Sequence, residues 1–128
     1  MNRLMILILG TLLVGGCIGS DVWRDMRVSS TESEAKLNNQ KIMNLTIGQP
    51  RNEVLDVMGP PAKREAYQLA NQRVVEFLFY RTSGWAVDDW RDKDYQFTPF
   101  AFEENKLVGW GRNYYDNVVR TAVEITTR

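Results

Sequence analysis

Residues 50–61 read Pro-Arg-Asn-Glu-Val-Leu-Asp-Val-Met-Gly-Pro-Pro, and this stretch separates a helical part of the chain from a strand-forming part. Pro50 suits the first helical position, where its missing N–H costs nothing. Gly59 suits the left-handed position that ends a helix, and the two prolines after it stop the helix. We therefore expect a short helix with an apolar face made of Val54, Leu55, Val57 and Met58.

Downstream of this helix the apolar residues recur with a period of 2, which is typical of strands. Residues 73–81, Arg-Val-Val-Glu-Phe-Leu-Phe-Tyr-Arg, predict a strong strand, and residues 63–69 predict a weaker one before a turn at 71–72. Residues 97–103 and 106–115 predict a hairpin across Glu104-Asn105. Because residues 73–81 carry apolar side chains on both faces, this strand is central or its outer face contacts something.

The secondary structure before residue 50 and after residue 115 is less clearly predicted. Thr31 and Glu34 match a capping box, which favours a first helix that starts at Thr31. Residues 117–127 fit a helix or a strand, with helical spacing favoured in the first half. The predicted fold class is α+β, with two N-terminal helices packed on one face of a three- to four-stranded antiparallel meander.

The N-terminus has the pattern of an export signal. Residues 1–3 supply a positive start, and the apolar run at residues 4–14 is shorter than the roughly 20 residues that span a bilayer. The following Val14-Gly15-Gly16-Cys17 resembles a bacterial lipobox, which implies that Cys17 is lipidated and anchors the protein to a membrane. We expect a lipoprotein signal peptide at 1–16, a lipidated tether at 17–30 and a domain at 31–128.

The sorting of this lipoprotein is also an expectation from resemblance. In Gram-negative lipoproteins an Asp after the lipidated Cys retains the protein at the inner membrane, and here Ile18 follows Cys17. If the source is a Gram-negative bacterium, the resemblance implies a lipid-anchored protein of the outer membrane that faces the periplasm.

Composition excludes several classes of function. The 128 residues include no histidine and one cysteine, so we expect no His-dependent nucleophile, no imidazole or thiolate metal site and no internal disulfide. Sixteen basic residues balance 16 acidic ones, so the net charge gives no reason to expect a nucleic-acid partner. We expect a protein without catalytic residues, cofactor, metal or small-molecule substrate.

Two segments resemble the SmpA/OmlA family, whose fold is that of the BamE lipoprotein. Residues 44–61 resemble its Gly, short helix and Gly-x-Pro motif, and residues 102–110 resemble its strand, turn and Lys-Leu-Val strand. The motif positions are filled by Gly48, Val54, Met58, Gly59 and Pro61. The resemblance implies an outer-membrane lipoprotein with two helices and a meander that acts by binding within the envelope.

The segment at residues 82–96 is the first candidate binding site. Fifteen residues are many for a connection between two strands, and long loops are often functional. This one contains Trp85, Trp90 and Arg91, residue types that are enriched at binding hot spots. Alternatively, its tryptophans cover one end of the core. Its aspartates do not predict a calcium loop, because no glycine lies between Trp85 and Gly109 to make the required turn.

Residues 109–115, Gly-Trp-Gly-Arg-Asn-Tyr-Tyr, are the second candidate. Trp110, Arg112 and Tyr114, with Tyr80 from the neighbouring strand, suggest an exposed patch of aromatic and arginine side chains. An ordinary cross-strand aromatic ladder is the alternative. The glycines suggest a bulge or a close approach to the backbone.

These patterns favour a non-enzymatic outer-membrane lipoprotein that acts as a binding or scaffold module in the cell envelope. Its expected partner is another envelope protein, and its expected process is outer-membrane protein assembly or envelope integrity. The competing hypothesis is a periplasmic inhibitor or chaperone-like binder of a soluble protein, built on the same fold.

Overall fold

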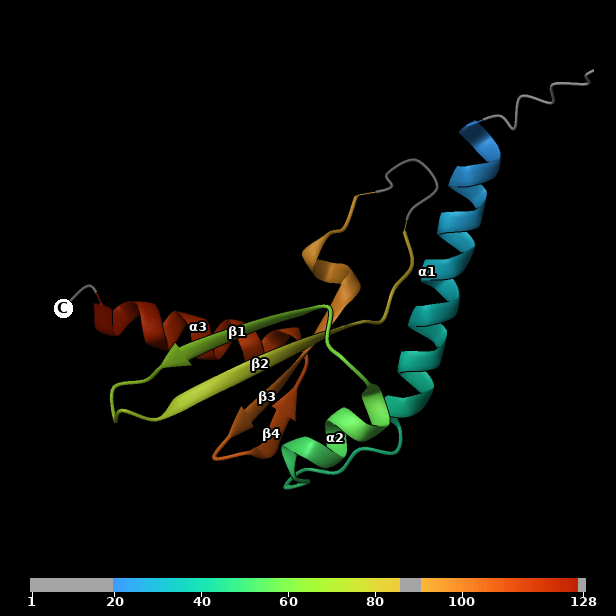
Figure 1. The fold of residues 1–128 in the computed structure, drawn as a ribbon. Coiled ribbons are helices and arrows are strands. Elements are labelled where there is room, and N and C mark those ends of the chain that lie inside the picture. The colour runs from blue at the N-terminus through green and yellow to red at the C-terminus, as the bar shows by residue number, and fades with distance from the viewer. Residues whose placement is uncertain (1–19, 86–90, 127–128) are drawn as a thin grey trace, which may run out of the picture.

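The structure is a computed structural model that describes residues 20–85 and 91–126. It is an α+β fold with two N-terminal helices, a four-stranded antiparallel meander and a C-terminal helix (Figure 1). The helices and strands are α1 (Ser20–Ile42), α2 (Arg51–Met58), β1 (Lys63–Gln68), β2 (Val74–Arg81), the short 3-10 helix η1 (Asp94–Gln96), β3 (Phe97–Glu103), β4 (Lys106–Trp110) and α3 (Arg112–Thr126). The predicted α+β class and the meander are confirmed.

Local signals in the sequence account for the ends of α2 and for the turn between β3 and β4. Pro50 precedes α2, and Gly59 follows it with a φ of 81°, from where its N–H donates to the Leu55 carbonyl oxygen at 2.7 Å. Glu104 and Asn105 both have positive φ, as a two-residue hairpin turn with the right twist requires. These elements form where the sequence predicts them, except that Pro50 precedes the helix and Arg51 is its first residue.

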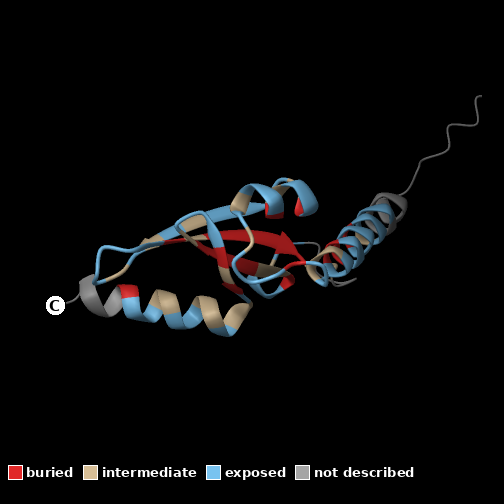
Figure 2. Ribbon diagram, turned by 90° about the horizontal axis from the view of Figure 1, so that it is seen from below, coloured by how far each residue is buried: buried red, intermediate tan, exposed pale blue. Residues whose placement is uncertain are grey.

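The sheet is covered on both faces, whereas the sequence predicted helices on one face only. Strand β2 is central and packs Tyr80 towards α2, while Phe77 packs towards α3. Figure 2 shows the buried strands between helices that lie on opposite sides. The expectation of one covered face was wrong because β2 is apolar on both faces, and the side chains of Tyr115 and Val118 on α3 pack on the second apolar layer.

The second strand of the hairpin is shorter than predicted. It ends at Trp110, because Gly111 takes a φ of 101° and the chain continues as α3 from Arg112. The helical alternative for residues 117–127 is therefore confirmed through Thr126. Both expectations for Gly109 are also met, because the β3–β4 register shifts beside it and the ring of Tyr114 lies over it.

Helix α1 starts earlier than the sequence predicted. It runs without a break from Ser20 to Ile42, so the residues expected as a tether are helical from Ser20 onward. The expected start at Thr31 was wrong, because the Thr31 hydroxyl donates to the Val28 carbonyl oxygen at 2.9 Å within a continuous helix. Within the described ranges no helix is long and apolar enough to cross a membrane.

Candidate binding site at the junction of α1 and β2

The segment that follows β2 is hydrogen-bonded to one face of α1. The side-chain amide of Asn38 donates to the Arg81 carbonyl oxygen at 2.8 Å, and that of Asn39 donates to the Thr82 carbonyl oxygen at 2.9 Å. Further along, the N–H of Trp85 donates to the hydroxyl of Thr31 at 3.3 Å. The donor and acceptor residues of α1 lie seven and eight positions apart, so they share one helix face. The start of the connection is therefore fixed against α1.

Arg81 is the centre of this junction. Its side chain is only 6% exposed, and its guanidinium pairs with the carboxylates of Glu34 from α1 and Asp92 from the connection. The ring of Phe97 lies 4.6 Å from the guanidinium carbon, and the ring of Trp85 lies 5.7 Å from it. We call this group of five residues the Arg81 centre.

Asp92 is ionised within the Arg81 centre, but not every donor of the Arg81 guanidinium has a hydrogen-bond partner among the described residues. Burial raises the pKa of Asp92, but hydrogen bonds from Trp85, whose Nε1 lies 2.6 Å away, and from Arg81 lower that pKa overall. The carboxylate therefore stays ionised beside the cation. Nη1 of Arg81 is buried, and no described residue accepts a hydrogen bond from it. Loss of either carboxylate would leave a buried charge poorly compensated.

The buried side chain of Gln96 forms hydrogen bonds to both ends of the connection. This side chain is 1% exposed; its Oε1 accepts from the N–H of Lys93 at 2.8 Å, and its Nε2 donates to the carbonyl oxygen of Gly84 at 2.8 Å. One buried amide therefore ties the two ends of the connection to each other. This arrangement holds the described part of residues 82–96 in a defined path instead of an open loop.

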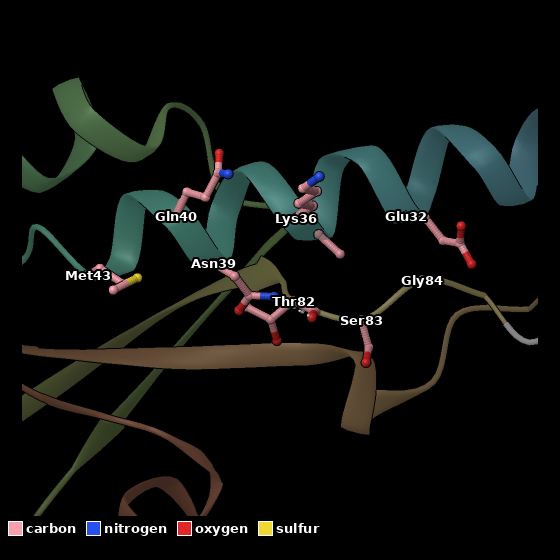
Figure 3. Close-up of a pocket in the computed structure, with 9 residues that line it drawn as sticks. Glu32, Lys36, Asn39, Gln40, Met43, Thr82, Ser83 and Gly84 are labelled. Carbon is pink, nitrogen blue, oxygen red and sulfur yellow. Dashed lines mark hydrogen bonds between the residues drawn. The ribbon is translucent and has the colours of Figure 1, made fainter.

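A groove of about 440 Å³ lies between α1 and the first residues of the connection (Figure 3). Gly84 lies against Glu32 at this groove, and an added Cβ would lie 2.6 Å from Cγ of Glu32, so a larger residue would displace that side chain. Figure 3 shows the polar side chains of α1 along one wall and the chain at Thr82 along the other. The lining residues are Glu32, Ala35, Lys36, Asn39, Gln40, Met43, Thr82, Ser83 and Gly84.

A second pocket, of about 430 Å³, lies at the Arg81 centre itself and is lined mainly by charged side chains. Three acidic and three basic side chains line it, together with Ala62 and Phe97: Glu34, Asp92, Asp94, Lys63, Arg81 and Lys93. Because the two signs balance, the pocket has no net charge to attract an ion of either sign. The described residues contain no group of three or more potential metal ligands.

The predicted contact residues of the connection have different environments. Trp85 is half-buried within the Arg81 centre, and Arg91 is exposed. Trp90 lies outside the described residues, and so does Cys17. Trp85 therefore has a packing role of the kind that the alternative interpretation describes, and a role in partner contact stays a prediction for all three residues of the connection.

Trp110, Arg112 and Tyr114 do not gather into one patch. Trp110 packs beside Phe100 on the sheet face that α2 covers, with ring centroids 6.0 Å apart, whereas Tyr114 lies over Gly109 on the opposite face. The guanidinium of Arg112 donates to the main-chain carbonyl oxygens of Asp94 and Phe97, where it holds the end of the connection.

Tyr80 is also remote from such a patch. It lies on β2, with β3 between it and β4, and its hydroxyl donates to the Gly59 carbonyl oxygen at 2.9 Å. Burial raises its pKa to about 12. Tyr80 is therefore a core residue that fixes the end of α2 and not part of an exposed surface.

Sequence patterns missed a second polar cluster, between β1 and α3. The carboxylate of Glu65 accepts from Tyr115 at 2.5 Å and from Tyr67 at 2.9 Å, and pairs with Lys63 at 3.0 Å. Burial raises the pKa of Glu65, but these three hydrogen bonds lower it overall. The cluster attaches α3 to the edge strand, and no sequence signal pointed to it because its members are far apart in the chain.

Fold and site together define a small α+β domain in which a long N-terminal helix holds a folded connection against one end of a meander. The chain belongs to the family described as Protein of unknown function (DUF3192), whose model matches residues 18–117. Neither the curated proteins nor the solved structures contain a protein that matches the chain. The family match includes the whole of α1 and the first residues of α3.

The family assignment corrects the resemblance to the SmpA/OmlA family. The two segments that carry the resemblance form a short helix that ends at a glycine and a tight hairpin turn. Both are common local structures that also occur in proteins of unrelated families. The resemblance therefore captured local geometry correctly and assigned the wrong family. The family match therefore also removes the ground for expecting a BamE-like domain at residues 31–128.

Proposed function

We propose that this protein is a lipid-anchored, non-enzymatic binding module of the cell envelope. The single observation that carries the proposal is the order of two features along the chain. The lipobox-like Val14-Gly15-Gly16-Cys17 comes first, and α1 begins three residues later at Ser20 and continues into the domain. The family match begins at residue 18, which supports a leader that is separate from the domain. The outer membrane is the proposed location, with the domain facing the periplasm.

The junction of α1 and β2 is the proposed binding surface. There the connection is held by Asn38, Asn39 and Gln96, and it borders a groove that is rimmed by exposed polar side chains of α1. A segment held in one conformation loses little entropy when it binds, which favours a preformed contact surface. The proposed contact residues of the connection are Trp85, Trp90 and Arg91.

Photo-crosslinking from the groove tests this surface. A photoreactive amino acid at Gln40 would line the groove, whereas the same group at Leu37, which is 51% exposed and does not line the groove, is the matched control on the same helix. We expect a discrete crosslinked envelope protein from position 40 in intact cells and little or none from position 37. Equal crosslinking from both positions, or none from position 40, would contradict the proposed surface.

The identity of the captured protein separates the two functional hypotheses. Recovery of an outer-membrane protein or an assembly component that is lost when Cys17→Ser releases the chain from the membrane supports the scaffold function. Recovery of a soluble periplasmic protein that is retained with Cys17→Ser supports the competing hypothesis, an inhibitor or chaperone-like binder.

A further inference from the structure

The pocket at the Arg81 centre contains a buried hydrogen-bond donor that the described residues leave unused. Arg81 lines this pocket of about 430 Å³, and its side chain is only 6% exposed. Its Nη1 is buried, and no described residue accepts a hydrogen bond from it. A buried N–H group without an acceptor costs free energy, so an acceptor that reaches Nη1 through the pocket would bind favourably.

The charged groups around this donor already pair with one another. The guanidinium of Arg81 pairs with the carboxylates of Glu34 and Asp92. At the same pocket the ammonium of Lys63 pairs with the carboxylate of Asp94 at 3.4 Å. Two carboxylates beside one guanidinium repel an anion that approaches Nη1, and the basic side chains of the lining repel a cation. The unused donor therefore favours an uncharged acceptor, such as a carbonyl oxygen.

The mouth of the same pocket carries a hydrogen-bond acceptor. The side chain of Asp94 is 83% exposed, whereas that of Arg81 is buried, so the carboxylate lies at the mouth and the guanidinium lies inside. The half-buried ring of Phe97 adds an apolar part to the lining. A peptide main chain carries both a carbonyl acceptor and an N–H donor, which match the inner donor and the outer carboxylate.

We propose that this pocket binds an uncharged peptide segment of a partner protein. A main-chain carbonyl oxygen of the segment accepts from Nη1 of Arg81, and a main-chain N–H donates to the carboxylate of Asp94. The pocket shares no lining residue with the groove, so it is a second contact site beside the proposed binding surface. The inference rests on the proposed function only for the presence of a protein partner, and it does not depend on the lipid anchor.

Three small peptides of similar size test the charge preference. At about pH 6, N-acetyl-alanine methylamide is uncharged, N-acetyl-alanine is an anion and alanine methylamide is a cation. Each is titrated into the full chain, purified from membranes in detergent. NMR follows the guanidinium signal of Arg81 and the main-chain signals of Lys93 and Phe97, which line the pocket. The main-chain signals of Lys36 and Gln40, which line the groove, are the control.

We expect saturable shifts of the pocket signals with the uncharged peptide, and about tenfold weaker binding of both charged peptides. Equal or tighter binding of either charged peptide would overturn the proposal, because the pocket would then select an ion. An absence of saturable shifts with all three peptides would overturn it as well. Saturable shifts confined to Lys36 and Gln40 would overturn the pocket while they support the groove as the binding surface.

A charge substitution at the mouth of the pocket tests the position of the peptide. Asp94→Asn removes a negative charge at an exposed side chain. Asp116→Asn is the matched control, because Asp116 is exposed on α3 and lines neither the pocket nor the groove. We expect Asp94→Asn to improve the binding of N-acetyl-alanine relative to the uncharged peptide, and Asp116→Asn to leave this ratio unchanged. An equal change in both variants, or no change in Asp94→Asn, would overturn the contact with Asp94.

Discussion

The side-chain amide of Asn38 donates a hydrogen bond of 2.8 Å to the carbonyl oxygen of Arg81, and both residues are buried. This bond joins the packed face of α1 to the end of β2, at the point where the chain leaves the sheet for the connection at residues 82–96. The Arg81 centre, the groove and the start of the connection all depend on this attachment.

Asn38→Ala should lower the free energy of unfolding by about 1–3 kcal/mol, because it removes the donor to a buried carbonyl oxygen. Asn39→Ala is the matched control, since Asn39 donates to Thr82 from an exposed position and should change stability by less than about 0.5 kcal/mol. Urea unfolding followed by circular dichroism measures both. Equal losses for the two variants would contradict the attachment through Asn38.

Trp85→Phe should lower the free energy of unfolding by about 1 kcal/mol, because phenylalanine keeps an aromatic ring beside Arg81 but loses the Nε1 donor to Asp92. Trp110→Phe serves as the comparison, because Trp110 packs by its ring alone and is 37% exposed. Thermal unfolding measures the change. Unchanged stability would contradict a stabilising role for the hydrogen bond from Trp85 to Asp92.

Gly109→Ala should destabilise the fold by about 1–3 kcal/mol, because the new Cβ would lie 2.9 Å from the Tyr114 ring on the first turn of α3. The double variant Gly109→Ala with Tyr114→Ala should lose less stability than the sum of the two single variants, because the clash is then absent. Chemical denaturation of all three variants gives the comparison. Strictly additive losses would refute this close approach.

Stability should fall in acid partly through Glu65. Its pKa is lower in the folded chain than in the unfolded chain, so its contribution is complete above the unfolded pKa and is lost as the pH falls through the folded pKa. Glu65→Gln should therefore flatten the decline of the unfolding free energy between about pH 7 and pH 3. Tyr115→Phe, which removes one of the donors, should flatten it less. A decline that is identical in all three proteins would contradict the role of Glu65.

Several elements were predictable because their signals are local. Pro50 and Gly59 mark the limits of α2, and Glu104-Asn105 marks the β3–β4 turn, through constraints that act within a few residues. The start of α1 was missed because the capping pattern at Thr31 competes with helix propagation from Ser20, and tertiary contacts at the later face of α1 favour the continuous helix.

The candidate site was much less predictable than the fold. The aromatic residues of the connection drew attention to residues 82–96, but the residues that hold this segment in place, Asn38 and Arg81, lie 43 positions apart. A charged residue at the end of an apolar strand and an asparagine on a helix face have no pattern that links them. Only the fold shows that they meet.

The mass of the mature N-terminus tests the central claim, a lipid-anchored domain, most directly. The protein is extracted from its native membranes with detergent, digested, and its N-terminal peptide is measured by mass spectrometry. We predict a peptide that begins at Cys17 and carries the mass of attached acyl chains. A peptide that contains residues 1–16 or an unmodified Cys17 thiol would contradict the anchor and, with it, the proposed location of the domain.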